Sequence, residues 1–99
     1  MLFDLVQSAS VLIQSTEYLS ECFNCTHVPK QICINIAYNC PRCMMYRNDQ
    51  DPNVIETRCC MSNCGPAYQV SMYDGRPTYF CQGDRCNVKR DPSVLGPIN

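Results

Sequence analysis

The chain has 99 residues, ten of them cysteine, and a formal net charge of −1. Its eight Lys and Arg residues are scattered and form no basic stripe of the kind that binds nucleic acid, so we expect no nucleic-acid partner. No stretch approaches the ~20 consecutive apolar residues that a membrane-spanning helix needs, so we expect no membrane span.

The first 20 residues differ in composition from the rest, because they contain no cysteine, Lys or Arg and their apolar residues have the spacing of one helical face. A secretory signal begins with basic residues and continues with an uninterrupted apolar run, but here Asp4 and Gln7 interrupt the run. We interpret residues 1 to 20 as a divergent or truncated signal segment, which fits the cysteine chemistry better, or as an amphipathic helix in front of the domain.

After this segment the pattern is typical of β-strands. Residues 32 to 39 alternate Ile32, Ile34 and Ile36 with other residues, which predicts a strand with one half-buried face. A cluster of turn residues at 49 to 53 then separates two further strand-like runs.

Residues 67 to 80 contain the clearest hairpin signal. The Asp-Gly dipeptide at 74 to 75 is typical of a type I′ turn, and folding about it places Val70 opposite Tyr79. Pro77 cannot donate to a strand ladder, so we expect it on an unpaired side.

The ten cysteines all lie between positions 22 and 86, a density typical of a disulfide scaffold. This stretch has too few large aliphatic residues for a conventional core, so it needs covalent bridges or a metal to offset the entropy of ordering. Two C-x-x-C pairs, at 22 to 25 and 40 to 43, allow a zinc site as the alternative. That site leaves six thiols without a role, so we favour five disulfides and an oxidising compartment.

Two short motifs carry a resemblance to a known family. The opening "CFNC" has an aromatic residue after its first cysteine, and the closing "TYFCQGDRCN", residues 78 to 87, ends in a Cys-Asn pair. With the cysteine spacing between them, residues 19 to 87 resemble the three-finger domains of the lymphocyte-antigen-6, urokinase-receptor and snake-toxin family. The resemblance implies a small disulfide-rich all-β fold in which three hairpin loops leave a cysteine-dense palm.

The chain departs from the family pattern in two places. The family has a cysteine directly before Cys81, where this chain has Phe80, and this chain has one additional cysteine in the doublet 59 to 60. The resemblance implies the pairs Cys22–Cys43, Cys25–Cys33, Cys40–Cys59, Cys60–Cys64 and Cys81–Cys86. It leaves open which cysteine of the doublet bonds to Cys40.

We predict three segments: residues 1 to 20 as described above, a three-finger domain over 21 to 90, and a flexible tail over 91 to 99. We predict a non-catalytic extracellular binding module for receptor modulation, adhesion or recognition, because one histidine and isolated acids do not build an active site. The expected partner is an extracellular or cell-surface protein, with no cofactor and a monomeric chain. The alternative is a small zinc-binding protein that uses "CFNC" and "CPRC".

Residues 88 to 99 lack the hydrophobic tail that directs a glycolipid anchor, so we expect a secreted protein, or one at the cell surface if the chain is truncated.

We predict that the second finger, residues 44 to 58, recognises the partner through Met45, Tyr46, Arg47 and Asp51. Tyr and Arg are enriched at interfaces and Met is common there. In a strand Met45 and Arg47 share one face and Tyr46 lies on the other. The alternative is that the methionines only fill a thin sheet.

Two asparagines have predicted roles of their own. Asn24 lies in the sequon Asn24-Cys25-Thr26 and is a candidate for glycosylation. Asn87 follows the last cysteine, and its amide, which can both donate and accept, is expected to pin the exit of the chain to backbone groups. The alternative for Asn87 is an ordinary turn residue.

Overall fold

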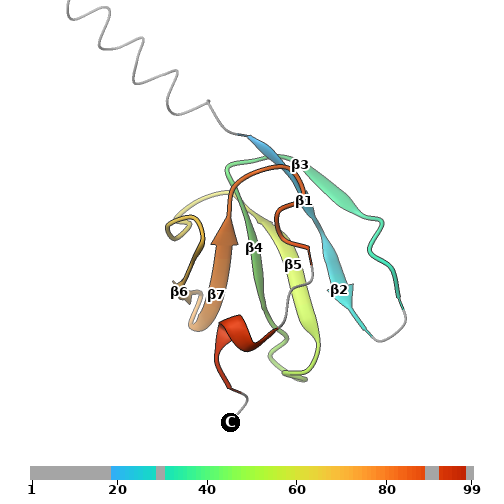
Figure 1. Ribbon diagram of the computed structural model, residues 1–99, viewed down its shortest axis with the longest axis vertical. Coiled ribbons are helices and arrows are strands. Elements are labelled where there is room, and N and C mark those ends of the chain that lie inside the picture. The colour runs from blue at the N-terminus through green and yellow to red at the C-terminus, as the bar shows by residue number, and fades with distance from the viewer. Residues whose placement is uncertain (1–18, 29–30, 89–91, 98–99) are drawn as a thin grey trace, which may run out of the picture.

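The computed structural model describes residues 19–28, 31–88 and 92–97. Within these residues the chain forms seven β-strands and one short 3-10 helix (Figure 1). They are β1 (Ser20–Phe23), β2 (Cys25–His27), β3 (Ile36–Cys40), β4 (Arg42–Arg47), β5 (Ile55–Cys60), β6 (Gln69–Tyr73), β7 (Arg76–Cys81) and η1 (Pro92–Leu95). Except for Leu19 and Ser20, the predicted signal or helix lies outside the described residues.

The strands form two antiparallel sheets. β1 pairs with β3, and the other strands form a five-stranded sheet in the order β2-β5-β4-β7-β6. In Figure 1 the smaller sheet lies at one end of the larger one, and the β4–β5 and β6–β7 hairpins extend away from it. The structure therefore confirms a small, all-β, disulfide-rich fold.

The β6–β7 hairpin has the predicted register. Val70 lies opposite Tyr79, and the turn residues Asp74 and Gly75 have φ angles of 55° and 80°, as a type I′ turn requires. Pro77 lies opposite Met72, one residue beyond the end of the β4–β7 register. The lack of an N–H at Pro77 therefore removes no hydrogen bond between β7 and β4.

The predicted strand over residues 32 to 39 is wrong in its first half. β3 begins at Ile36, and the side chains of Ile32 and Ile34 are 88% and 81% exposed. β3 pairs with β1 only as far as Phe23, after which the chain crosses to β2 and pairs with β5. Residues 32 to 35 consequently have no strand beside them.

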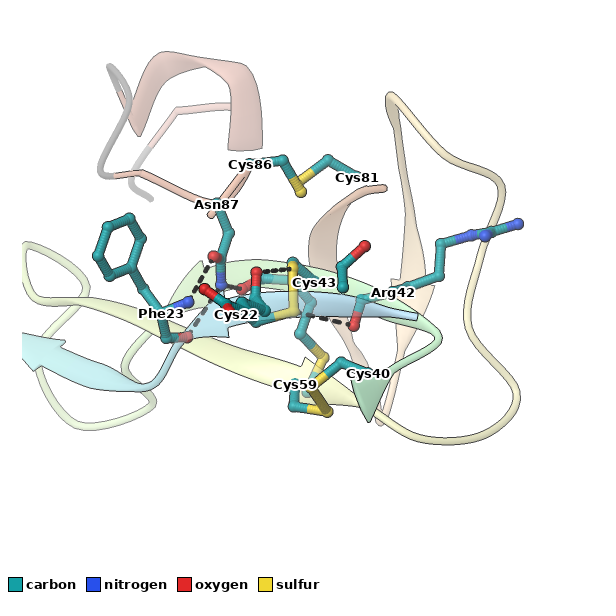
Figure 2. Close-up of a disulfide and its surroundings, with 12 residues drawn as sticks. Cys22, Phe23, Cys40, Arg42, Cys43, Cys59, Cys81, Cys86 and Asn87 are labelled. Carbon is teal, nitrogen blue, oxygen red and sulfur yellow. Dashed lines mark hydrogen bonds between the residues drawn. A yellow bond between two sulfur atoms is a disulfide. The ribbon is translucent and has the colours of Figure 1, made fainter. Parts of the chain in front are cut away.

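All ten cysteines form disulfides. The bonds are Cys22–Cys43, Cys25–Cys33, Cys40–Cys59, Cys60–Cys64 and Cys81–Cys86. These pairs coincide with those that the resemblance implies, and Cys59 is the member of the doublet that bonds to Cys40. Four fully buried cysteines, Cys22, Cys40, Cys43 and Cys81, form a cluster where the two sheets meet (Figure 2).

Two apolar clusters lie on opposite faces of β4. Met44 packs with Cys60 and Phe80 on one face, and Met45 packs with Ile55 on the other. The alternation expected along this strand is therefore confirmed. Phe80, which directly precedes Cys81, is fully buried.

Both predicted ends of the domain need correction. Ser20 belongs to β1 and is 4% exposed, and its hydroxyl accepts a hydrogen bond from the Gly83 N–H at 2.9 Å. Leu95 of η1, assigned to a flexible tail, is buried against Met45 and Ile55. The fold thus includes Ser20, which bonds to Gly83, and part of the C-terminal segment, which packs on Met45 and Ile55.

Candidate functional site

Asn87 connects three strands through its side-chain amide. Its Oδ1 accepts a hydrogen bond from the Phe23 N–H at 2.9 Å. Its Nδ2 donates to the carbonyls of Phe23 at 3.1 Å, Met44 at 3.0 Å and Arg58 at 3.3 Å. Figure 2 shows this amide beside β1, close to the buried disulfides. The side chain is fully buried, so it fixes β1 to β4 and β5 from within and acts in the scaffold rather than at a surface.

A row of aligned residues crosses the five-stranded sheet on one face. The registers place Thr26 beside Glu56, Glu56 beside Tyr46, and Tyr46 beside Thr78. Side chains on neighbouring strands in register project to the same side. We call this side the charged face and define it by Tyr46, Asn48, Asp49, Glu56, Arg58 and Arg76.

Glu56 lies at the centre of a hydrogen-bonded group on the charged face. Its carboxylate accepts hydrogen bonds from the Thr26 hydroxyl, from Asn48 Nδ2 at 2.7 Å and from Arg58 Nη2 at 2.9 Å. Burial alone raises the pKa of Glu56, but these hydrogen bonds and the charge of Arg58 outweigh it, so the pKa lies below its ordinary value. Glu56 is therefore ionised at neutral pH and holds the neighbouring side chains in place.

Arg76 lies over the ring of Tyr46, with its Cζ 4.0 Å from the ring centroid. Its Nη1 donates to Asp49 Oδ2 at 2.7 Å, and its Nη2 lies 3.8 Å from Asp74 Oδ2. The hydrogen bond to Asp49 raises the pKa of Arg76, against partial burial, which lowers it. The result is a cation stacked on an aromatic ring, with exposed carboxylates at its rim.

The structure separates the four residues predicted to bind a partner. Tyr46 lies on the charged face, whereas Met45 is on the opposite face and fully buried. Arg47, beside Met45, donates to the carbonyls of Pro52 at 3.0 Å and Gly96 at 2.6 Å. Asp51 is exposed at the hairpin tip, where its Oδ1 accepts from the Asn53 N–H.

The prediction for Met45 is therefore wrong, because a fully buried side chain cannot contact a partner. Arg47 joins the hairpin tip to the C-terminal segment.

The remaining residues of the charged face, above all Arg76 and Glu56, were not predicted from the sequence. Arg76 follows the predicted turn in sequence, but nothing local indicates that β7 pairs with β4 and places Arg76 over Tyr46.

The four cysteines of "CFNC" and "CPRC" are all bonded as disulfides, Cys22 and Cys43 to one another and Cys25 and Cys40 to Cys33 and Cys59. None of them is a thiolate, the form in which cysteine ligates zinc. The alternative of a zinc site on these two pairs is therefore not supported.

Asn24, the predicted glycosylation site, is exposed between β1 and β2, and its N–H donates to the Asn35 carbonyl at 2.9 Å. Thr26 of the same sequon is exposed, with its hydroxyl bonded to Glu56. Glycosylation of Asn24 stays a prediction.

Among residues 19–28, 31–88 and 92–97 there is no helix long and apolar enough to cross a membrane. Comparisons of the chain with protein-family models, with curated proteins and with solved structures find no match.

Proposed function

We propose that this chain is a non-catalytic, extracellular protein-binding module with the three-finger arrangement, and that its charged face contacts the partner. The placement of the strands supports the arrangement, since β2 and the β4–β5 and β6–β7 hairpins all extend away from the smaller sheet (Figure 1), and the buried Cys22 and Cys40 belong to that sheet. Five disulfides support an oxidising compartment, and hence an extracellular partner.

The observation that carries the proposal is the stack of Arg76 on Tyr46. Arg and Tyr are enriched among the residues that contribute most to protein–protein affinity. Both side chains come from central strands, β7 and β4, and Asp49 holds the guanidinium in place. A side chain ordered before binding loses less entropy when the complex forms. The charged face therefore presents an ordered cation and aromatic ring to a partner.

The surroundings of the single histidine support a non-catalytic role. His27 is buried in β2, and its Nε2 lies 3.0 Å from Thr57 Oγ1. The same hydroxyl contacts both the N–H and the carbonyl of Cys25. A hydroxyl and imidazole enclosed by the sheet in this way stabilise strand pairing and are not open to a substrate.

The test begins with capture of a partner from a library of displayed extracellular domains, followed by affinity measurements on variants. Arg76→Ala should weaken binding about 30-fold, the effect of an interface residue that contributes about 2 kcal/mol. Arg76→Lys should recover only part of this loss, because an ammonium group keeps the charge but not the planar stack.

Arg85→Ala is the matched control. Arg85 is also an arginine in an ion pair, 3.1 Å from Glu21, but both its side chain and its N–H bond to Glu21 in β1 of the smaller sheet, whereas the charged face belongs to the five-stranded sheet. Each variant is first checked for five disulfides by intact mass and for folding by circular dichroism. Equal losses of affinity for the Arg76 and Arg85 variants, or no loss for Arg76→Ala, would contradict the proposed interface.

A further inference from the structure

β6 is an edge strand of the five-stranded sheet and has none of the usual protection against pairing with another chain. Its residues, Gln69–Tyr73, include no charged residue and no proline, and its register with β7 is regular from Gln69 to Tyr73. The irregularity at Tyr68, whose N–H donates to the Phe80 carbonyl, lies before the strand begins. Charges, prolines and bulges are the features by which proteins normally block a free edge. The other edge, β2, has only three residues.

The hairpin register shows which backbone groups of β6 face outward. In a two-residue hairpin the pair beside the turn, here Tyr73 and Arg76, exchanges hydrogen bonds, and bonded and non-bonded pairs then alternate. Ser71 is thus bonded to β7, whereas Val70 and Met72 direct their N–H and C=O groups away from it. Within the described residues no other segment forms backbone hydrogen bonds with these two positions.

The side chains at the same two positions are also open to solvent. Val70 is 41% exposed and Met72 is 67% exposed. Because they are two residues apart in a strand, they project to the same face. The edge thus offers both free backbone groups and apolar side chains at Val70 and Met72.

We propose that two copies of this chain associate by antiparallel pairing of their β6 strands about a two-fold axis at Ser71. This register places Val70 opposite Met72 of the second copy, and Met72 opposite Val70 of the second copy. Each of these two pairs exchanges the outward N–H and C=O groups, and the two five-stranded sheets become one. The inference does not depend on the function proposed for the charged face.

The charge pattern favours a second copy as the occupant of this edge. An uncharged strand meets its own copy without like charges directly opposite, which would destabilise the pair. The nearest charge along the chain is Asp74 in the turn, three residues from the axis. The two Asp74 residues of the dimer are therefore about 20 Å apart along the strands, well beyond the ~8 Å screening length at physiological salt. Arg76, opposite Tyr73 on β7, donates to Asp49 on the charged face.

The size of the contact sets the expected affinity. A five-residue strand with two exposed apolar side chains buries less than the ~1,200 Å² of a stable interface. The dimer should therefore be transient, with a dissociation constant of roughly 0.1 to 1 mM. The monomer expected from the sequence is then the form at low concentration.

Sedimentation analysis of the full chain from about 10 μM to about 2 mM, a range that spans this dissociation constant, tests the association. V70K/M72K places lysine opposite lysine in both cross-strand pairs and should weaken the dimer at least about tenfold. V70K/M72E removes the same apolar side chains but places lysine opposite glutamate in both pairs. It should dimerise at least as well as the unmodified chain at low salt, and less well at high salt.

Amide hydrogen exchange tests the register itself. The amides of Val70 and Met72 should exchange more slowly as protein concentration rises, whereas the Ser71 amide, already bonded to β7, should not change. I32K/I34K is the matched control, since it also replaces two exposed apolar residues by lysine. These residues flank Cys33, which is bonded to Cys25 of β2, the edge strand opposite β6.

All variants are checked for folding and for five disulfides before use. A chain that stays monomeric to about 2 mM, well above the expected dissociation constant, overturns the proposal. So does equal loss of association in V70K/M72K and V70K/M72E, which would indicate unspecific apolar contact. Loss of the dimer in I32K/I34K alone would place the contact at the β2–β3 connection and also overturn it.

Discussion

Replacement of Asn87 by alanine should destabilise the fold more than any exposed polar substitution. The side chain is fully buried and has hydrogen bonds to Phe23, Met44 and Arg58, all with backbone groups. Alanine can replace none of them. The variant would leave the Phe23 N–H and the carbonyls around it without their partner, in a region closed to bulk water.

The expected magnitude follows from these contacts. One accepted bond and two N–H donors shared among three carbonyls amount to about three hydrogen bonds, each worth about 1 kcal/mol net. Buried groups left unsatisfied add further destabilisation of about 1 kcal/mol or more. We expect Asn87→Ala to lower the free energy of unfolding by about 3 to 5 kcal/mol, a large part of the ~5 to 15 kcal/mol of a small domain.

Guanidinium unfolding with the disulfides intact measures this loss. The chain has no tryptophan and six tyrosines, so near-ultraviolet circular dichroism is the suitable signal. Asn53→Ala, at an exposed asparagine in the β4–β5 turn, is the control and should change stability by less than about 0.5 kcal/mol. A loss below about 1 kcal/mol for Asn87→Ala would refute the assigned role, because it would mean that the amide contributes no more than one ordinary hydrogen bond.

Asn87→Asp adds a test with a defined sign. Aspartate keeps the acceptor for the Phe23 N–H but places a second oxygen against the carbonyls of Met44 and Arg58. The neutral acid can still donate one hydrogen bond, so the pKa of the new carboxyl should be higher in the folded state than its unfolded value of about 3.9. Relative to the unmodified protein, the variant should be most stable below about pH 4 and lose stability as pH rises through the folded-state pKa. A relative gain of stability with rising pH would contradict the role assigned to the Asn87 amide.

Two further predictions concern the disulfides and Glu56. Reduction should raise the intact mass by ten hydrogens, and free thiol in the native protein would contradict this. Removal of Cys22–Cys43 should lower the unfolding free energy by about 1.5 kcal/mol more than removal of Cys60–Cys64, since the two bonds span 21 and 4 residues. Because the pKa of Glu56 is lowered from 4.5 in the folded state, its ionised form stabilises the fold above that pH, and this stability is lost as pH falls through the lower folded-state pKa. Glu56→Gln should therefore reduce the loss of melting temperature between about pH 5 and pH 2, and an unchanged acid profile would contradict this.

The sequence alone was sufficient where the cause lies within a few residues. The Asp74–Gly75 dipeptide has the backbone freedom that a type I′ turn needs, and that turn sets the pairing of Val70 with Tyr79. Alternation along a strand placed Met45 and Tyr46 on opposite faces. The shortage of large aliphatic residues indicated that covalent bridges or a metal must offset the entropy of ordering, and the six thiols that a zinc site would leave over favoured disulfides.

The tertiary structure decided what depends on residues far apart in the chain. Residues 32 to 35 have the alternation of a strand, but Ile32 and Ile34 are exposed, because β1 and β2 pair with different neighbours and no strand lies beside this segment. Leu95 belongs to the core because it packs on Met45 and Ile55, two apolar side chains on one face of the five-stranded sheet. The charged face depends in the same way on the pairing of β4 with β7, which brings Arg76 over Tyr46. The type of a residue determines which groups its side chain can bond. Only the pairing of strands distant in sequence determines which of those groups lie next to it.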